Sequence, residues 1–208
     1  MRVAKEGWPF ILGFWALLAA FWFLQWTIAF WVWLPVAIWV IAFFRDPERT
    51  GERGPNVVIA PADGLVVSIV DIDEPTYHKE RVQRVAIFMN VFDVHVNRYP
   101  MDGTVEYRHY LPGKFGHAQE DKASELNEQS SVGLKTAKGK LLLRQIAGLV
   151  ARRIITDHQP GTTVQQGERM GLIRFGSRVD VFLPAAATVS VRVGDRTQAG
   201  RTVIARWS

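Results

Sequence analysis

A glycine followed by a serine, Gly176-Ser177, is the pair of residues whose types best suit chemistry on a peptide bond. The pair lies between two strand-like runs, 169–174 and 179–183, near the C-terminal end of the sequence. A serine hydroxyl can attack the carbonyl carbon of the residue before it. Glycine in that place lacks the Cβ that would crowd the attack, and it permits strained backbone angles. Most Gly-Ser pairs are simple turns, so this hypothesis needs support from the rest of the chain.

A histidine and an aspartate are the other candidates for proton transfer. His95 follows an apolar run and precedes Val96-Asn97-Arg98, a position at a strand end where imidazole can act as a general base near neutral pH. The alternative is a structural histidine that bonds to backbone. Asp63 lies in the turn-like segment Pro61-Ala62-Asp63-Gly64. Its carboxylate could orient an imidazole, or it could serve ordinary turn chemistry.

A polar stretch with mixed charge, 121–128, has two interpretations. Such a stretch is usually a solvated surface, but it could also bind a polar headgroup. Asn127 and Glu128 at its end are the candidates for substrate binding, and Lys114 carries the same two interpretations. The wider polar segment 118–127 is expected to be a short helix or a loop.

Composition excludes several kinds of site. The sequence has no cysteine, which excludes disulfides, thiolate nucleophiles and cysteine-ligated zinc. The other histidines lack metal-ligand spacing, so no metal site is expected. No Gly-rich phosphate loop is present. The net charge of +5 suits nucleic acid or an anionic membrane surface. Because no long basic run or RNA-binding aromatic motif occurs, we expect a membrane partner and no nucleic acid.

An uncharged stretch, 8–44, supports the membrane interpretation and contains seven of the eight tryptophans. A single helix of this length would measure about 55 Å, whereas the hydrocarbon core is about 30 Å thick. We therefore predict a helical hairpin with arms near 8–24 and 28–44; the alternative is one tilted span kinked at Pro35. Basic residues flank the stretch on both sides, so both ends and the catalytic part are expected on the cytoplasmic side of the inner membrane. These flanking residues are Arg2, Lys5, Arg45, Arg49 and Arg53.

Short β-type runs separated by turn residues follow a polar linker at 46–55. This spacing predicts a mainly β fold, a sandwich or barrel with lipoyl-like elements, behind the N-terminal membrane hairpin. We expect a membrane anchor at 1–45 and a catalytic domain at 46–208. The predicted strands are 57–60, 65–72, 85–91, 103–110, 132–136, 141–146, 149–156, 162–165, 171–175, 179–183, 188–193 and 202–205.

Seven segments in order resemble the phosphatidylserine decarboxylase family, in its short, archaeal-type class. The resemblance extends from about residue 36 to about residue 205, and seven motifs in one order are highly specific. The segments are Phe43-Phe44-Arg45-Asp46-Pro47-Glu48-Arg49, Pro61-Ala62-Asp63-Gly64, Phe92-Asp93-Val94-His95-Val96-Asn97-Arg98, Pro112-Gly113-Lys114-Phe115, Asp121-Lys122-Ala123-Ser124 with Asn127-Glu128, Gln145-Ile146-Ala147-Gly148 with Ala151-Arg152-Arg153, and Phe175-Gly176-Ser177.

The resemblance implies a proenzyme that cleaves itself between Gly176 and Ser177 into a large chain, 1–176, and a small chain, 177–208. Ser177 would become a covalent pyruvoyl group, the only cofactor expected. That group would form a Schiff base with phosphatidylserine and accept electrons as CO2 leaves, which yields phosphatidylethanolamine. A membrane lipid would be the substrate, and the family is often homodimeric.

The resemblance also implies roles for the two candidate proton-transfer residues. His95 would be the base for self-cleavage and the proton donor to the product, with Asp63 as its orienting partner. The long form of the family has a second histidine three residues after the first, where this sequence has Arg98. The short class as a whole shows this change, which bears on the role of His95 more than on the family.

Two other classes of function stay open on the sequence. A carrier or binding module would use Gly-rich turns such as 166–171, with Lys138 or Lys140 at a hairpin tip, although no carrier-type lysine hairpin motif occurs. A membrane-anchored hydrolase would use Ser177 as an ordinary nucleophile, but the Gly-x-Ser-x-Gly elbow is missing.

Overall fold

The chain divides into two units, Met1–Glu48 and Arg49–Ser208, and each is described by itself. The structure is a computed structural model. The predicted division into an anchor and a self-cleaved catalytic domain stays a prediction. The described residues are 2–113, 127–148, 153–174 and 176–207.

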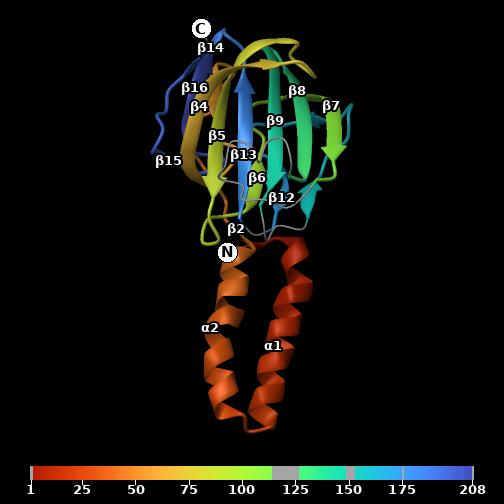
Figure 1. The fold of residues 1–208 in the computed structure, drawn as a ribbon, viewed down its shortest axis with the longest axis vertical. Helices are drawn as coiled ribbons and strands as arrows, with labels where there is room; N and C mark the ends of the chain where they lie inside the picture. The colour runs from red at the N-terminus through yellow and green to blue at the C-terminus, as the bar shows by residue number, and fades with distance from the viewer. Residues whose placement is uncertain (1, 114–126, 149–152, 175, 208) are drawn as a thin grey trace. The chain divides into compact units, whose positions relative to one another are not determined.

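Two apolar helices, α1 (Trp8–Phe23) and α2 (Thr27–Phe43), form most of the first unit (Figure 1). They lie side by side, and the rings of Phe14 and Trp33 meet across them with centroids 5.7 Å apart. The prediction of a helical hairpin is therefore confirmed. The chain leaves the helical conformation between Phe23 and Thr27 and not at Pro35, so the alternative of one long span kinked at this proline is wrong.

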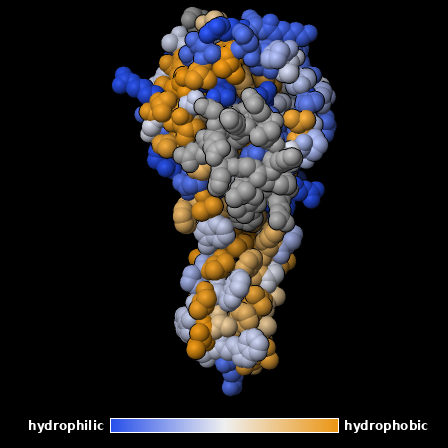
Figure 2. All heavy atoms as spheres, viewed as in Figure 1, coloured by the Kyte–Doolittle hydropathy of each residue, from blue (hydrophilic) through white to orange (hydrophobic). Residues whose placement is uncertain are grey.

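The helical unit exposes apolar side chains that water would disfavour. Figure 2 shows its visible face mostly in orange and pale colours. The stretch Lys5–Phe23, which joins the short helix η1 (Lys5–Gly7) to α1, is long and apolar enough to cross a membrane, and α2 is slightly shorter. A two-stranded ladder of β1 (Arg2–Val3) and β2 (Arg45–Asp46) joins the two ends of this unit. This composition favours association with a membrane.

An eight-stranded antiparallel sheet, curled into a half-barrel, dominates the second unit (Figure 1). The mainly β prediction is confirmed. Short turns make antiparallel neighbours of strands that follow each other in sequence, as at the β8–β9 hairpin, whose turn residues are Ala137 and Lys138. In spatial order the strands are β11 (Thr163–Val164), β7 (Gly103–Leu111), β8 (Gln129–Thr136), β9 (Gly139–Ala147), β13 (Ser177–Leu183), β5 (Glu80–Met89), β4 (Gly64–Glu74) and β15 (Arg196–Thr197).

Two three-stranded sheets complete the unit. One has the order β10 (Ile154–Thr156), β12 (Arg169–Ile173), β6 (Val96–Arg98), and the other has the order β14 (Ala187–Val189), β16 (Val203–Trp207), β3 (Val57–Ile59). The main apolar core is lined by one face of the eight-stranded sheet. Along β13 the residues on that face are Val179, Val181 and Leu183, as the two-residue period of a strand requires.

The strand predictions differ from the structure at three places that concern the site. The strand predicted at 179–183 begins at Ser177, so this serine belongs to a strand and not to a turn. The short strand β6, just after His95, was not predicted. Of the strand predicted at 149–156, Ile154–Thr156 is observed. Residues 149–152, 118–126 and Phe175 lie outside the described residues.

Candidate functional site

Ser177 is the first residue of β13, at the end of a central strand of the eight-stranded sheet. It is opposite Met89 of β5 on one side and Ala147 of β9 on the other. The residue is fully buried, and its Oγ has no hydrogen-bond partner among the described residues. A buried hydroxyl without an acceptor is uncommon, because the lost hydration costs about 1–3 kcal/mol. No hydrogen bond among the described residues therefore holds this hydroxyl in place.

Gly176 joins two different sheets in a backbone conformation that favours glycine. The chain leaves β12 of a three-stranded sheet at Ile173 and enters β13 of the large sheet at Ser177. Gly176 has φ 59°, in the left-handed region. A Cβ built on Gly176 would meet no described atom within 4 Å. The backbone angle accounts for glycine here, and the expectation that a Cβ would crowd the attack by the adjacent Ser177 stays a prediction.

His95 lies immediately before β6 and is fully buried. Its backbone carbonyl accepts a hydrogen bond from the amide of Ile173 at 3.4 Å, so His95 is held beside the strand that leads into Gly176. Its ring Nδ1 lies 3.0 Å from the carbonyl oxygen of Asp93. A carbonyl can only accept, so Nδ1 carries the proton, and in the neutral ring Nε2 is then the proton-accepting atom.

Asp63 is buried and forms hydrogen bonds to a guanidinium and to a backbone amide. Its carboxylate accepts hydrogen bonds from Arg49 Nη2 and from the Ala199 amide, each at 2.7 Å. Burial raises the pKa of Asp63, while the Ala199 amide and the Arg49 guanidinium oppose that rise. The contact described for the His95 ring nitrogen is the Asp93 carbonyl. The role of Asp63 in orienting His95 stays a prediction.

Asn127 and Glu128 lie just before β8, and β9 lies between β8 and the strand of Ser177. Asn127 Nδ2 donates to the carbonyl oxygen of Ala147 at 2.8 Å, and the Ala147 amide donates to the carbonyl oxygen of Glu128 at 3.0 Å. The Glu128 carboxylate accepts from the Tyr110 hydroxyl at 2.9 Å. Both residues are therefore tied to the residue that faces Ser177. Lys114 lies outside the described residues.

Sequence reasoning missed two buried amides near Ser177, those of Asn97 and Gln145. Both are fully buried, and Gln145 Nε2 donates to Asn97 Oδ1 at 2.8 Å. The available signal was a polar residue on the core side of an apolar run, as in Leu141-Leu142-Leu143-Arg144-Gln145-Ile146. Buried polar residues of this kind are hydrogen-bonded, so they mark positions where the fold has a specific requirement.

Comparison with known proteins decides the family. The family model described as phosphatidylserine decarboxylase matches residues 36–205. Relatives named phosphatidylserine decarboxylase proenzyme include those of Symbiobacterium thermophilum (46% identical, 98% of this chain and 95% of the relative), Magnetococcus marinus (48%, 98% and 94%) and Nitrosomonas europaea (42%, 99% and 95%). The chain belongs to the phosphatidylserine decarboxylase family. It is thus a member of a family of decarboxylase enzymes, which decides against the non-catalytic carrier module.

The match to the phosphatidylserine decarboxylase family includes every described candidate site residue. Gly176, Ser177, His95 and Asp63 all lie within residues 36–205. Within the described ranges, no group of three or more potential metal-ligating side chains occurs.

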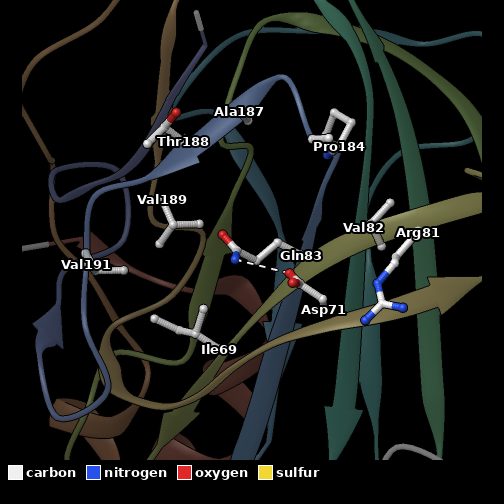
Figure 3. A pocket seen from close by; sticks show the side chains of 11 residues that line it. Ile69, Asp71, Arg81, Val82, Gln83, Pro184, Ala187, Thr188, Val189 and Val191 are labelled. Atoms are coloured by element: carbon white, nitrogen blue, oxygen red, sulfur yellow. Dashed lines mark hydrogen bonds between the residues drawn. The ribbon is translucent and has the colours of Figure 1, made fainter.

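An open pocket on the same unit lies away from these residues. It has a volume of about 580 Å³ and is lined by side chains of β4, β5 and the segment around β14 (Figure 3). In it Gln83 donates to Asp71 at 3.2 Å. The described residues that line it include neither Ser177 nor His95. The pocket therefore contributes nothing to the chemistry considered for Ser177.

Proposed function

We propose that this chain is a self-processing, pyruvoyl-dependent enzyme that converts phosphatidylserine to phosphatidylethanolamine and CO2. One observation carries the proposal: the Ser177 hydroxyl is fully buried, has no described hydrogen-bond partner, and directly follows a glycine at φ 59°. The names of the relatives, all phosphatidylserine decarboxylase proenzymes, support the substrate and the processing.

The first step is attack of Ser177 Oγ on the carbonyl carbon of Gly176. The C–N bond between the residues breaks, an ester forms, and the proton from Oγ passes to the freed nitrogen of Ser177. Loss of the Ser177 α-proton then expels the carboxylate that ends chain 1–176. The aminoacrylate that remains takes a proton on its CH2 carbon and becomes an imine. Water then adds to the imine carbon and ammonia leaves, which gives the pyruvoyl group at the start of chain 177–208.

His95 is the proposed base for this attack and the later proton donor. Its Nδ1 bond to the Asp93 carbonyl leaves Nε2 as the atom that can take the Ser177 proton. Asp63, the carboxylate of the segment 61–64 that resembles the family, is proposed to orient the His95 imidazole. The same imidazole is proposed to protonate the product at Cα after CO2 has left.

The pyruvoyl cofactor would be formed from Ser177 itself, so it would lie at the buried position of this serine. The pyruvoyl group supplies an electron sink for the carbanion left when CO2 departs. Glu128 is proposed to accept hydrogen bonds from the substrate ammonium, with Asn127 and Lys114 contributing to headgroup binding. We further propose that the enzyme is a homodimer and that it acts on the cytoplasmic side of the inner membrane.

A serine-to-alanine comparison tests the proposal. Wild type, Ser177→Ala and the exposed control Ser190→Ala are purified in detergent and incubated with phosphatidylserine vesicles and cyanoborohydride. We expect wild type and Ser190→Ala to form phosphatidylethanolamine, with substrate trapped on the small chain, and Ser177→Ala to do neither. Decarboxylation by Ser177→Ala, or by an uncleaved wild-type chain, would contradict the proposal.

A further inference from the structure

A chain of hydrogen-bonded polar side chains is buried at the Ser177 end of the β unit. Ser130 Oγ lies 2.8 Å from Thr156 Oγ1, and Thr156 donates to Gln145 Oε1 at 2.9 Å. Gln145 Nε2 donates to Asn97 Oδ1 at 2.8 Å, and Asn97 Nδ2 donates to the sulfur of Met89 at 3.6 Å. Ser130, Gln145 and Asn97 are buried. The four polar side chains come from four strands: Ser130 from β8, Thr156 from β10, Gln145 from β9 and Asn97 from β6.

The hydrogen bonds of this chain all run in one direction. The Thr156 hydroxyl has one hydrogen and gives it to Gln145, so Ser130 must be the donor in the first bond. If both amides were reversed, the oxygen of Asn97 would face the Met89 sulfur. Neither atom can donate, so the hydrogen bond between Asn97 and Met89 would be lost. Bonds aligned in this way strengthen one another in a low dielectric. The arrangement is therefore specific in its orientation, and one lost member leaves a buried group unsatisfied.

The central bond of the chain joins β6, the strand that follows His95, to β9, which pairs with the strand of Ser177. Asn97 lies two residues after His95, and Gln145 lies two residues before Ala147, which is opposite Ser177. Residues two apart on a strand point to the same side, so the Gln145 amide shares a side of β9 with Ala147. The Asn97–Gln145 hydrogen bond thus connects the His95 strand to the strand paired with Ser177.

This connection matters because β6, the strand that follows His95, and β13, the strand of Ser177, belong to different sheets. In the described structure β6 pairs with β12 in a three-stranded sheet, while β9 and β13 pair in the eight-stranded sheet. Apolar packing between sheets is non-directional and does not fix their offset. A base and its nucleophile must be held within about 0.5 Å of the productive geometry. A short, buried amide–amide bond can hold that offset where a backbone ladder does not.

We propose that Asn97 and Gln145 are positioning residues that fix His95 against Ser177 for self-cleavage. This inference rests on the proposed function, because it takes His95 as the base. The effect is indirect, through the placement of the two strands. A displacement of about 1 Å at a reacting pair can lower a rate by about 100-fold.

The test measures self-cleavage of newly made precursor in cell-free translation with liposomes, followed as conversion of the 208-residue chain over time and pH. Gln145→Met keeps the approximate volume but removes the bridge, and we expect cleavage to slow about 10- to 100-fold. The swap Asn97→Gln with Gln145→Asn keeps one amide on each strand and should recover much of the rate. Leu143→Val, on the same strand and the same core face, is the matched packing control and should cleave like wild type.

Folding is measured separately, as thermal unfolding of each variant in a Ser177→Ala background. This excludes variants that fail to fold, and the swap variant keeps the test decisive. Wild-type cleavage rate and pH profile in folded Gln145→Met would overturn the inference, as would equal slowing in Leu143→Val without rescue by the swap. In both cases the proposed function stands if wild type is cleaved and Ser177→Ala is not. An uncleaved wild-type chain would instead remove the proposed function itself.

Discussion

Two buried polar groups at opposite ends of the eight-stranded sheet, the Glu74 carboxylate and the Ser177 hydroxyl, have opposite surroundings. At the β4–β5 turn, the Glu74 carboxylate accepts hydrogen bonds from the amides of Thr76, Tyr77 and His78, at 3.2, 2.8 and 2.8 Å. At the other end, the buried Ser177 hydroxyl has no described partner. A fully hydrogen-bonded carboxylate such as that of Glu74 is typical of a stability element, whereas a buried hydroxyl without a described partner, such as that of Ser177, is typical of a site where strain and reactivity are kept.

The pKa values of Glu74 and His78 show which charge states the surroundings favour at the β4–β5 turn. Burial raises the pKa of Glu74, but the hydrogen bonds from the Thr76 hydroxyl and three amides lower it by more, so the net pKa is below its usual value. Burial lowers the pKa of His78, and the nearby Glu74 and Glu80 carboxylates oppose this only in part. The turn end therefore favours a charged Glu74 and a neutral His78.

The largest expected effect is at the Ser177 end, from removal of the proposed base. His95→Gln should slow self-cleavage by about 100-fold or more, because general base catalysis contributes about that much. The rate is measured as precursor conversion by electrophoresis, with His109→Gln on the exposed part of β7 as the control. Unchanged cleavage in folded His95→Gln would remove His95 from the mechanism.

The next largest effect is expected at the β4–β5 turn, where a substitution should lower the free energy of unfolding and leave self-cleavage unchanged. Glu74→Ala leaves buried amides without an acceptor, so the free energy of unfolding should fall by about 2–4 kcal/mol. Urea unfolding in a Ser177→Ala background measures this, with exposed Asp73→Ala as the matched control. A loss of less than about 0.5 kcal/mol would contradict the comparison between the two ends.

A smaller effect is expected from the backbone before the scissile bond. Gly176→Ala in a Ser177→Ala background should lower the free energy of unfolding by about 1–2 kcal/mol, the cost of a left-handed conformation for an L-residue. Gly176→Asn should cost less, since asparagine tolerates this region. Equal stability of all three proteins would show that φ 59° is not required.

The smallest expected effect is a pH dependence at the turn end. The folded state binds a proton at His78 less readily than the unfolded chain, whose pKa is about 6.5. The stability that neutral His78 contributes is therefore present above about pH 6.5 and is lost as the pH falls below that value. Unfolding free energies between about pH 7.5 and 5.5 should decline less steeply in His78→Gln than in wild type. Parallel pH profiles would contradict this assignment.

The helices and most strands could be predicted because they depend on local pattern. The uncharged run 8–44 allows two membrane-length helices, and alternating apolar residues mark the strands. The start of β13 could not be predicted in the same way, since Arg178 and Asp180 look like surface residues. They are buried and bind each other through two hydrogen bonds, at 2.8 and 3.0 Å, so the strand extends back to Ser177.

Contacts between distant parts of the chain explain what the sequence could not provide for the site. Ser177 was predicted as the reactive residue from its neighbour and its motifs, but its burial follows from strands far away in sequence. The bond of Asp63 to the Ala199 amide joins residues 136 apart, and the Asn97–Gln145 bond joins residues 48 apart. Local pattern carries no information on such pairings, which the tertiary fold determines.

The most direct test of the central claim is the intact mass of the purified wild-type protein in a preparation that decarboxylates phosphatidylserine. We predict two chains, 1–176 and 177–208, with the smaller one beginning in a ketone that reacts with a hydrazide. A single chain of 208 residues with an ordinary serine at 177, in fully active material, would contradict the account.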